Sequence, residues 1–426
     1  MKKNSILRGK NGENYLIPFV LITSLFFMWG LANNMTDTLL AAFKKIMSMN
    51  DFQTSLIQVA FYGSYFCFAL PAAIYIKKYS YKSGVLLGLI LYALGCFLFL
   101  PASSMASYPF YLFALYVLAG GCSILETSAN PYILTMGPEE NATQRLNLAQ
   151  AFNPIGSITG ILLSQFYILG ELHSANEAER AVMSSQELEA IQAHELNAVT
   201  MTYVYVGIVL LAIFLLIRFI RMPKGTSSIT GESSKFGATF KRLIKNKRYT
   251  FGVITQFFYV GAQIGVWSYT IRYVMTHMDY NEKDSASIYL YSIIGFTLAR
   301  FVFTALMKII KPAYLLIIAS AGAIICSSIV IFSGGGSGVI ALVGISIFMS
   351  LMFPTIYGIA MYKLGDDAKI GGSGLIMAIL GGAVLTAVQG LVSDIAQSIN
   401  WAYIVPLCCF IVVAVYGYWS SRLSNE

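Results

Sequence analysis

Charged residues are scarce in this sequence. Only 11% of the 426 residues are Asp, Glu, Lys or Arg, while 57% are hydrophobic, and a soluble globular protein carries about 25% charged residues. This deficit excludes a water-soluble fold. At about 20 apolar residues for each membrane-spanning helix, the chain accommodates about a dozen spans and leaves little length for an extramembrane domain.

The sequence also lacks the motifs of several enzyme and metal-binding classes. It contains no GxxxxGK[ST], no GxSxG and no HExxH, which disfavours ATP-driven transport and hydrolase chemistry. Its three histidines lie in a polar segment or at a helix end, where they suit neither zinc nor a proton relay. The six cysteines lie in apolar runs without a CxxC pair and are interpreted as packing residues. We therefore expect no metal, no cofactor and no enzymatic activity.

Positive charge is unevenly distributed along the chain. The net charge of +8 would suit a nucleic-acid binder, but Lys and Arg lie in short clusters between apolar runs. With the amino terminus inside, the outer segments carry only Lys44, Lys45, Arg180 and Lys283. This bias predicts two cytoplasmic termini and no nucleic-acid partner. The polar, basic start is typical of a cytoplasmic tail and not of a signal peptide.

The lengths of the apolar runs predict an all-α integral membrane protein of about twelve transmembrane helices. The spans are expected at Tyr15 to Phe43, Gln53 to Ile76, Tyr81 to Leu100, Pro109 to Met136, Leu146 to Leu169, Thr200 to Phe219, Thr250 to Met275, Ala286 to Met307, Ala313 to Phe332, Val339 to Tyr362, Ser373 to Ile399 and Trp401 to Ser420. They form two six-helix halves, 1–220 and 250–426.

Two polar segments interrupt these spans. Residues 221–249 are Gly/Ser-rich and then basic, which is typical of a flexible cytoplasmic linker that ends in an amphipathic helix at the lipid surface. Residues 171–197 carry five spaced glutamates after Glu171 and are expected to form an outer loop with short surface helices.

The two halves resemble each other weakly. FFMWG at Phe26 to Gly30 matches FFYVG at Phe257 to Gly261, and Gly156 parallels Gly382 at a similar offset. Duplicated six-helix halves are an architecture of secondary transporters, whose substrate site lies near the middle of the membrane. Polar residues inside the spans are therefore the candidates for function, because they are costly in lipid.

Glu126 is the deepest of the few charges within the spans. It lies about 25 Å along its helix from the expected outer end, at 1.5 Å per residue. Asn130 follows one turn later, so a carboxylate and an amide share one helix face, where they can bind vicinal sugar hydroxyls or exchange a proton. The alternative is a protonated glutamate that makes a structural hydrogen bond between helices.

Asp37 lies four residues after Asn33 and three after Asn34, so the three polar groups occupy neighbouring faces of one helix. This spacing indicates a wet cavity and a second functional carboxylate. The alternative is an aspartate at the outer interface, close to two lysines. Arg272 and Arg300 also lie within apolar spans, and for both we favour a structural role over substrate contact.

Amides and aromatic rings recur on two further spans. Asn147, Gln150 and Asn153 are spaced three apart and precede a glycine that loosens the helix; Gln150 and Asn153 are the better binding candidates. In the second half, Tyr259, Gln263 and Trp267 repeat at helical spacing. Amides beside rings suit the polar edge and the apolar face of a pyranose, although core packing alone also explains the aromatics.

These motifs resemble the fucose:proton symporter family of the major facilitator superfamily, whose members carry fucose, galactose or glucose. The resemblance rests on SLFFMWGLANNMTD, LETSANPYILTMGPEE, RLNLAQAFNPIG and FFYVGAQIGVWSYTIRY, and it covers nearly the whole chain. It implies the major facilitator fold in a bacterial inner membrane. It also implies that Asp37 and Glu126 are the functional carboxylates, and that Asn33, Gln150 and Asn153 lie at cavity positions.

One departure from the family pattern concerns the sugar. Phe353 stands before the proline of FPTIY, where the fucose permeases of this family have Tyr, and one missing hydroxyl alters specificity. We predict a monomeric importer of L-fucose or a related hexose that uses proton symport. The alternatives are a galactose or glucose symporter of the same family, a membrane-embedded transferase, or a sugar sensor without transport.

Overall fold

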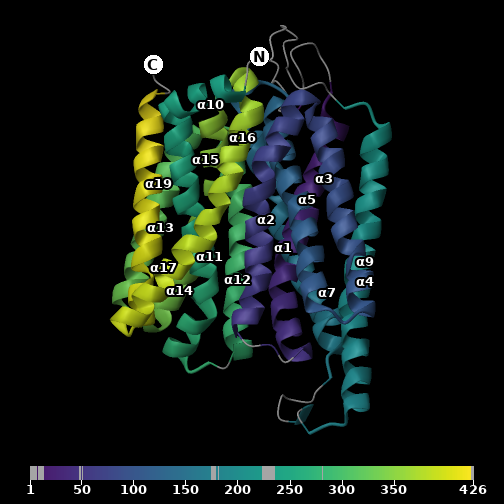
Figure 1. Ribbon diagram of the computed structural model, residues 1–426. Helices are drawn as coiled ribbons and strands as arrows, with labels where there is room; N and C mark the ends of the chain where they lie inside the picture. The colour runs from purple at the N-terminus through teal and green to yellow at the C-terminus, as the bar shows by residue number, and fades with distance from the viewer. Residues whose placement is uncertain are drawn as a thin grey trace. The chain divides into compact units, whose positions relative to one another are not determined.

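The computed structural model of the protein describes residue 7 and residues 14–47, 49, 51–173, 179–180, 182–222, 236–280 and 282–423. Within these ranges, the side chains at 36–42, 44–45, 51–55, 58, 165, 169 and 282–283 lie outside the described part. The described elements are helical (Figure 1). The predicted all-α membrane architecture is confirmed.

The α-helices follow the predicted apolar runs closely. They are α1 (Leu16–Ile46), α2 (Asp51–Lys78), α3 (Tyr81–Phe97), α4 (Phe99–Ser104), α5 (Tyr108–Thr135), α6 (Ala142–Gln150), α7 (Phe152–Tyr167), α9 (Ser185–Phe219), α10 (Phe236–Lys245), α11 (Lys247–Met278), α12 (Glu282–Leu306), α13 (Pro312–Phe332), α14 (Gly335–Met349), α15 (Met352–Met361), α16 (Ala368–Met377), α17 (Gly381–Ala396), α18 (Ile399–Ala402) and α19 (Ile404–Leu423).

Ten segments of the described chain are long and apolar enough to cross a membrane. The other two predicted spans are also helical. The run from Leu146 to Leu169 forms α6 and α7, which meet at Ala151, and the run from Thr250 to Met275 forms α11. Five predicted spans are each divided between two α-helices with only a few residues between them: α3 and α4, α6 and α7, α14 and α15, α16 and α17, and α18 and α19.

The segment 171–197 differs from its prediction. We expected short surface helices, but α9 begins at Ser185 and continues without a break into the following span. The hydroxyl of Ser184 caps the helix by accepting a hydrogen bond from the backbone N–H of Glu187. The sequence that follows, QELEAIQAHEL, consists mainly of strong helix formers. The serine cap and the helix propensity of these residues therefore extend α9 beyond the amino-terminal end of the predicted span.

The chain divides into two compact units. The amino-terminal unit comprises Ile17–Ala129 and Phe152–Lys224; the carboxy-terminal unit comprises Met1–Leu16, Asn130–Ala151 and Gly225–Glu426. The boundary passes through α5 and again between α6 and α7. The predicted halves, 1–220 and 250–426, follow the sequence order and stay a prediction.

Hydrogen bonds explain why α6 belongs to the carboxy-terminal unit. The Gln144 side chain donates to the carbonyl oxygen of Thr304 on α12, at 3.0 Å. The Asn147 amide donates to the hydroxyl of Thr355 on α15, at 3.2 Å. Both amides are buried, so these bonds fix α6 against the two helices.

Close helix approaches occur at equivalent places in both units. A side chain added at Gly156 on α7 would collide with the carbonyl oxygen of Phe27 on α1. In the carboxy-terminal unit, one added at Gly381 would collide with the carbonyl oxygen of Phe257 on α11. Small residues allow such close packing of membrane helices. Each glycine therefore meets one of the two matching FF motifs, as expected for a duplicated architecture.

Candidate functional site

Glu126 belongs to a hydrogen-bonded chain within the amino-terminal unit. Its side chain on α5 is 4% exposed. The Tyr65 hydroxyl on α2 donates to Glu126 Oε1 at 3.4 Å, and the indole N–H of Trp29 on α1 donates to the Tyr65 oxygen at 2.7 Å. Three helices therefore contribute to the surroundings of this one carboxyl group.

The hydroxyl groups beside Glu126 bind to backbone. Thr127 donates to the carbonyl oxygen of Ser123 at 2.8 Å, and Ser123 donates to that of Tyr65 at 2.9 Å. The first bond lies within α5, and the second joins α5 to α2. The Tyr65 hydroxyl donates to the carboxyl group of Glu126. The sequence alone did not single out Tyr65 as a candidate.

Two predicted amides of the amino-terminal unit lie on α1 and α7. Asn33 is partly buried, and its Oδ1 atom is buried without a hydrogen-bond partner in the described part of the chain. Asn153 donates to the carbonyl oxygen of Phe26 at 3.3 Å. Asp37 lies within α1, but its side chain is outside the described residues. Its predicted role remains a prediction.

The carboxy-terminal unit brings together two other predicted amides. Gln150 donates to Asn130 Oδ1 at 2.7 Å, and both side chains are buried. Asn130 follows Glu126 by one turn of α5, as predicted, although contacts assign the two residues to different units. An amide pair of this kind presents donors and acceptors that can exchange partners with sugar hydroxyls.

Arg300 organises the polar centre of the same unit. Its side chain is 3% exposed. It donates to the carbonyl oxygen of Ser350 at 2.5 Å and to that of Gln150 at 2.9 Å, and its guanidinium lies over the Phe296 ring, 4.5 Å from the centroid. The favoured structural interpretation of Arg300 agrees with this geometry, because the guanidinium donates to backbone carbonyl oxygens.

The predicted aromatic residues of the second half cluster near this arginine. The Tyr259 hydroxyl donates to the carbonyl oxygen of Met349 at 2.9 Å, and its ring lies edge to face with Phe353 at 6.4 Å. The Trp267 indole N–H donates to the hydroxyl of Ser346 at 3.3 Å. Gln263 is partly exposed on α11. Hydrogen bonds to α14 therefore fix the orientations of the Tyr259 and Trp267 rings.

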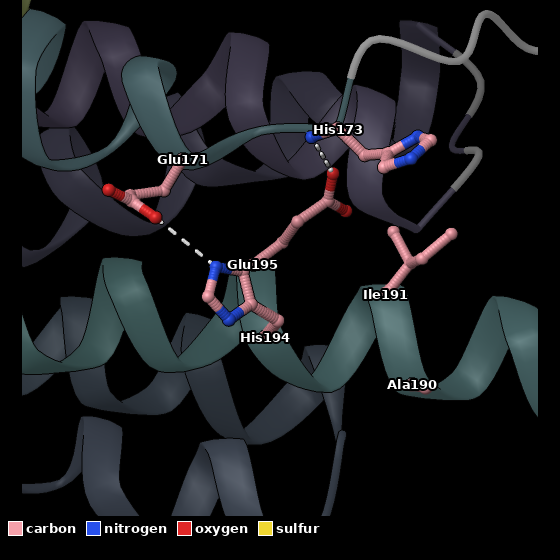
Figure 2. A pocket seen from close by; sticks show the side chains of 6 residues that line it. All are labelled: Glu171, His173, Ala190, Ile191, His194 and Glu195. Carbon is pink, nitrogen blue, oxygen red and sulfur yellow. Dashed lines mark hydrogen bonds and ion pairs between the residues drawn. The ribbon is translucent and has the colours of Figure 1, made fainter.

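Two pockets of the described chain lie away from these residues. One, of about 370 Å³, is lined by Glu171, His173, Ala190, Ile191, His194 and Glu195 (Figure 2). The other, of about 500 Å³, is lined by Arg272, Thr276, His277, Ser393, Asp394, Gln397, Ser398, Ile399 and Asn400. Neither contains a predicted site residue.

The smaller pocket is built around an ion pair. Glu195 accepts hydrogen bonds from the Arg180 guanidinium at 2.5 and 2.9 Å. It also accepts one from the backbone N–H of His173 at 2.8 Å (Figure 2). Hydrogen bonding to Glu195 raises the pKa of Arg180. Among the described residues, no three His, Cys, Asp or Glu side chains gather in a way that could hold a metal ion. The Arg180–Glu195 pair joins the segment before α9 to that helix.

The sequence of this chain is similar to known proteins over nearly its full length. A family model described as Major Facilitator Superfamily matches residues 21–387. A Haemophilus influenzae protein named L-fucose-proton symporter is 40% identical over 95% of this chain and 97% of its own. A Brucella abortus protein named glucose/galactose transporter is 32% identical over 96% of this chain and 95% of its own.

The fold also matches that of a solved structure. A crystal structure of FucP, a transporter of the same superfamily in the outward conformation, has 37% sequence identity and a TM-score of 0.90, and the match covers 95% of this chain and 99% of that chain. The chain therefore belongs to the Major Facilitator Superfamily of membrane transporters and, within it, to the fucose:proton symporter family.

Proposed function

We propose that this protein imports L-fucose or a related hexose together with protons, by alternating access. The observation that carries the proposal is the buried carboxyl group of Glu126, which a tyrosine and a tryptophan from two other helices hold in place. Ionisable residues inside membrane spans serve proton and substrate pathways by default. The L-fucose-proton symporter of Haemophilus influenzae supports the choice of sugar.

Protonation of a carboxyl group gives a physical route to coupling. A charged carboxylate resists burial, because desolvation disfavours the ionised form. Uptake of a proton from outside removes this penalty, so that the protein closes around its sugar only when the carboxyl group is neutral. One proton that moves inward across 100 mV contributes about 2.3 kcal/mol, enough to concentrate sugar about fifty-fold. Asp37 and Glu126 are the proposed proton carriers.

Sugar recognition is assigned to amides and rings. Asn33 has a buried amide oxygen with no partner among the described residues, and the Gln150–Asn130 pair offers exchangeable hydrogen bonds. The other proposed sugar contacts are Glu126, Asn153, Tyr259, Gln263, Trp267 and Phe353. The protein is proposed to act as a monomer in a bacterial inner membrane, with both termini in the cytoplasm.

A second candidate substrate is galactose or glucose. The Brucella abortus glucose/galactose transporter matches almost the full chain, and Phe353 packs its ring against Tyr259 and Tyr357. An apolar wall at this position favours the 6-methyl group of fucose over the 6-hydroxyl of galactose. Because one hydrophobic contact contributes about 1 to 3 kcal/mol, galactose is expected to compete at about ten-fold higher concentration.

Counterflow in proteoliposomes separates these candidates. Vesicles loaded with each unlabelled sugar in turn are exposed to the labelled form of fucose, galactose, glucose or lyxose. We expect the fastest exchange with L-fucose, weaker exchange with galactose, and none in vesicles that contain Glu126→Ala. Exchange of glucose without exchange of L-fucose would overturn the substrate assignment.

A further inference from the structure

The short helix α10 carries an exposed apolar ridge. Phe236, Phe240 and Ile244 are 39%, 49% and 55% exposed, and their spacing of four residues places them in one stripe. The two phenylalanine rings stack at 6.0 Å. Thr239 and Leu243 are buried, so that this side of the helix faces the carboxy-terminal unit. The ridge is therefore presented outward on a helix that is docked on its other side.

This ridge belongs at the surface of the membrane. Ten residues of helix are about 15 Å long, half of the roughly 30 Å of the hydrocarbon core, so α10 cannot be a span. Figure 1 places it at the end of its unit where α19 ends. A helix with an apolar stripe and flanking basic residues lies in the interfacial plane, with its apolar face in the boundary between headgroups and acyl chains.

Two contacts fix the orientation of α10. Arg242 makes a bidentate ion pair with Asp367, at 2.8 and 2.6 Å. Hydrogen bonding to Asp367 raises the pKa of Arg242, so that the guanidinium remains charged. Directly after α10, the Tyr249 hydroxyl donates to the carbonyl oxygen of Gly371 on α16, at 2.8 Å. The helix therefore cannot turn its ridge inward without breaking these bonds.

Basic side chains lie on α10, at the start of α11 and shortly after α15. Lys241, Lys245 and Lys247 are exposed, and Arg248 and Lys363 both lie over the Tyr362 ring, at 5.2 and 5.3 Å from its centroid. The ion pairs found among the described residues leave these five cations without a carboxylate partner. The ridge shares α10 with Lys241 and Lys245, and the other three cations lie on the start of α11 and after α15. An apolar ridge together with such cations is complementary to an amphiphile with an anionic headgroup.

We propose that α10 and these five cations form a binding site for an anionic phospholipid of the cytoplasmic leaflet. The ridge of Phe236, Phe240 and Ile244 contacts the upper acyl chains, and the ammonium and guanidinium groups bind the phosphodiester. The occupied site braces the connection between α15 and α16 through Arg242 and Asp367. This site is separate from sugar transport, so binding can be tested whatever the transported substrate is.

The test is direct lipid binding to the full-length purified protein. Phosphatidylglycerol and phosphatidylcholine are titrated in detergent, and bound lipid is counted by native mass spectrometry. Each surface lysine near an anionic headgroup contributes about 1 kcal/mol, so Lys241→Gln with Lys245→Gln should weaken phosphatidylglycerol binding by about thirty-fold. Lys308→Gln with Lys311→Gln removes the same charge elsewhere and should change it less than two-fold.

Three further measurements sharpen the test. Inorganic phosphate at the same concentration should not displace phosphatidylglycerol, since it lacks acyl chains. Phe240→Ser should weaken binding, whereas Phe240→Leu should retain it. Melting temperatures of all variants should match the wild type, because the substituted side chains are exposed. Equal phosphatidylglycerol affinity in the wild type and the Lys241/Lys245 double variant would overturn the proposal, as would an equal loss in the control double variant.

Discussion

Each of the two units buries an ionisable side chain, but the hydrogen-bond partners of that side chain differ between the units. In the carboxy-terminal unit, Arg300 directs its donors to the carbonyl oxygens of Ser350 and Gln150. In the amino-terminal unit, the carboxyl group of Glu126 accepts a long hydrogen bond, 3.4 Å, from the hydroxyl of Tyr65. The guanidinium donates to backbone carbonyl oxygens, and the carboxyl group accepts from a side-chain hydroxyl.

This difference separates a structural charge from a switchable one. Arginine is protonated at any physiological pH, and its bonds to backbone carbonyls tie helix ends together permanently. A carboxyl group can become neutral by taking up one proton, and a weak hydroxyl donor does not prevent this. Under the proposed function, the comparison teaches that the chemistry of the side chain and the kind of its partners, and not burial alone, distinguish the proposed transport residue from a structural one.

The largest effect is expected at Glu126. Glu126→Gln keeps the shape and the hydrogen-bonding capacity of the side chain but removes the exchangeable proton, so sugar uptake should fall to background while the protein still inserts and folds. Uptake by vesicles and the melting temperature are measured together. Uptake within a factor of two of the wild type would remove Glu126 from the mechanism.

Asp37 tests whether the switch comprises one carboxyl group or two. Asp37→Asn mimics the protonated form, so it should lose gradient-driven accumulation, about fifty-fold at 100 mV, and still bind sugar. Accumulation is compared with equilibrium binding in the same preparation. Equal loss of both would assign Asp37 to sugar recognition, with Glu126 alone as the proton carrier.

Substitution of Arg300 is expected to lower the thermal stability of the protein. Arg300→Met leaves two buried carbonyl oxygens without their donor, at a cost of about 1 to 3 kcal/mol each, so the melting temperature in detergent should fall clearly. Arg300→Lys keeps the charge but not the planar fork and should recover only part of the loss. An unchanged melting temperature together with lost proton coupling would contradict the structural assignment.

The smallest effect is expected at Tyr65. Tyr65→Phe removes the hydroxyl that joins Trp29 to Glu126. A net hydrogen bond contributes about 0.5 to 1.5 kcal/mol, so the uptake rate should fall about two- to ten-fold. Tyr75→Phe, on the same helix, is the matched control and should stay within two-fold. A complete loss of uptake in Tyr65→Phe would mean that the hydroxyl itself relays the proton.

The sequence was sufficient to predict the fold and to single out Glu126 as a candidate, whose role stays a prediction. A span in lipid needs a long apolar run, so an embedded glutamate such as Glu126 is conspicuous in the sequence. The partners of Arg300 are backbone carbonyls, which carry no sequence signature. Tyr65 is one of many aromatic residues in α2, and only the approach of α1 and α5 distinguishes it. Such relations depend on tertiary packing and become visible only in the structure.

The extent of α9 was missed for a local reason. Glutamates suggested a loop at 171–197, because charge ends an apolar run. Glutamate is nevertheless a good helix former, and the capping serine Ser184 begins the helix well before the apolar residues. Hydropathy locates the part of a helix that lies in lipid, whereas capping and propensity determine where the helix begins.

The measurement that tests the central claim most directly is the pH of the medium when sugar is added. L-fucose added to de-energised cells that express the protein should make the medium more alkaline, as sugar and proton enter together, and a protonophore should cancel the signal. Cells with Glu126→Gln should give no signal, and replacing sodium by potassium should change little. Uptake of L-fucose without alkalinisation, or with a strict sodium requirement, would contradict the proton-coupled account.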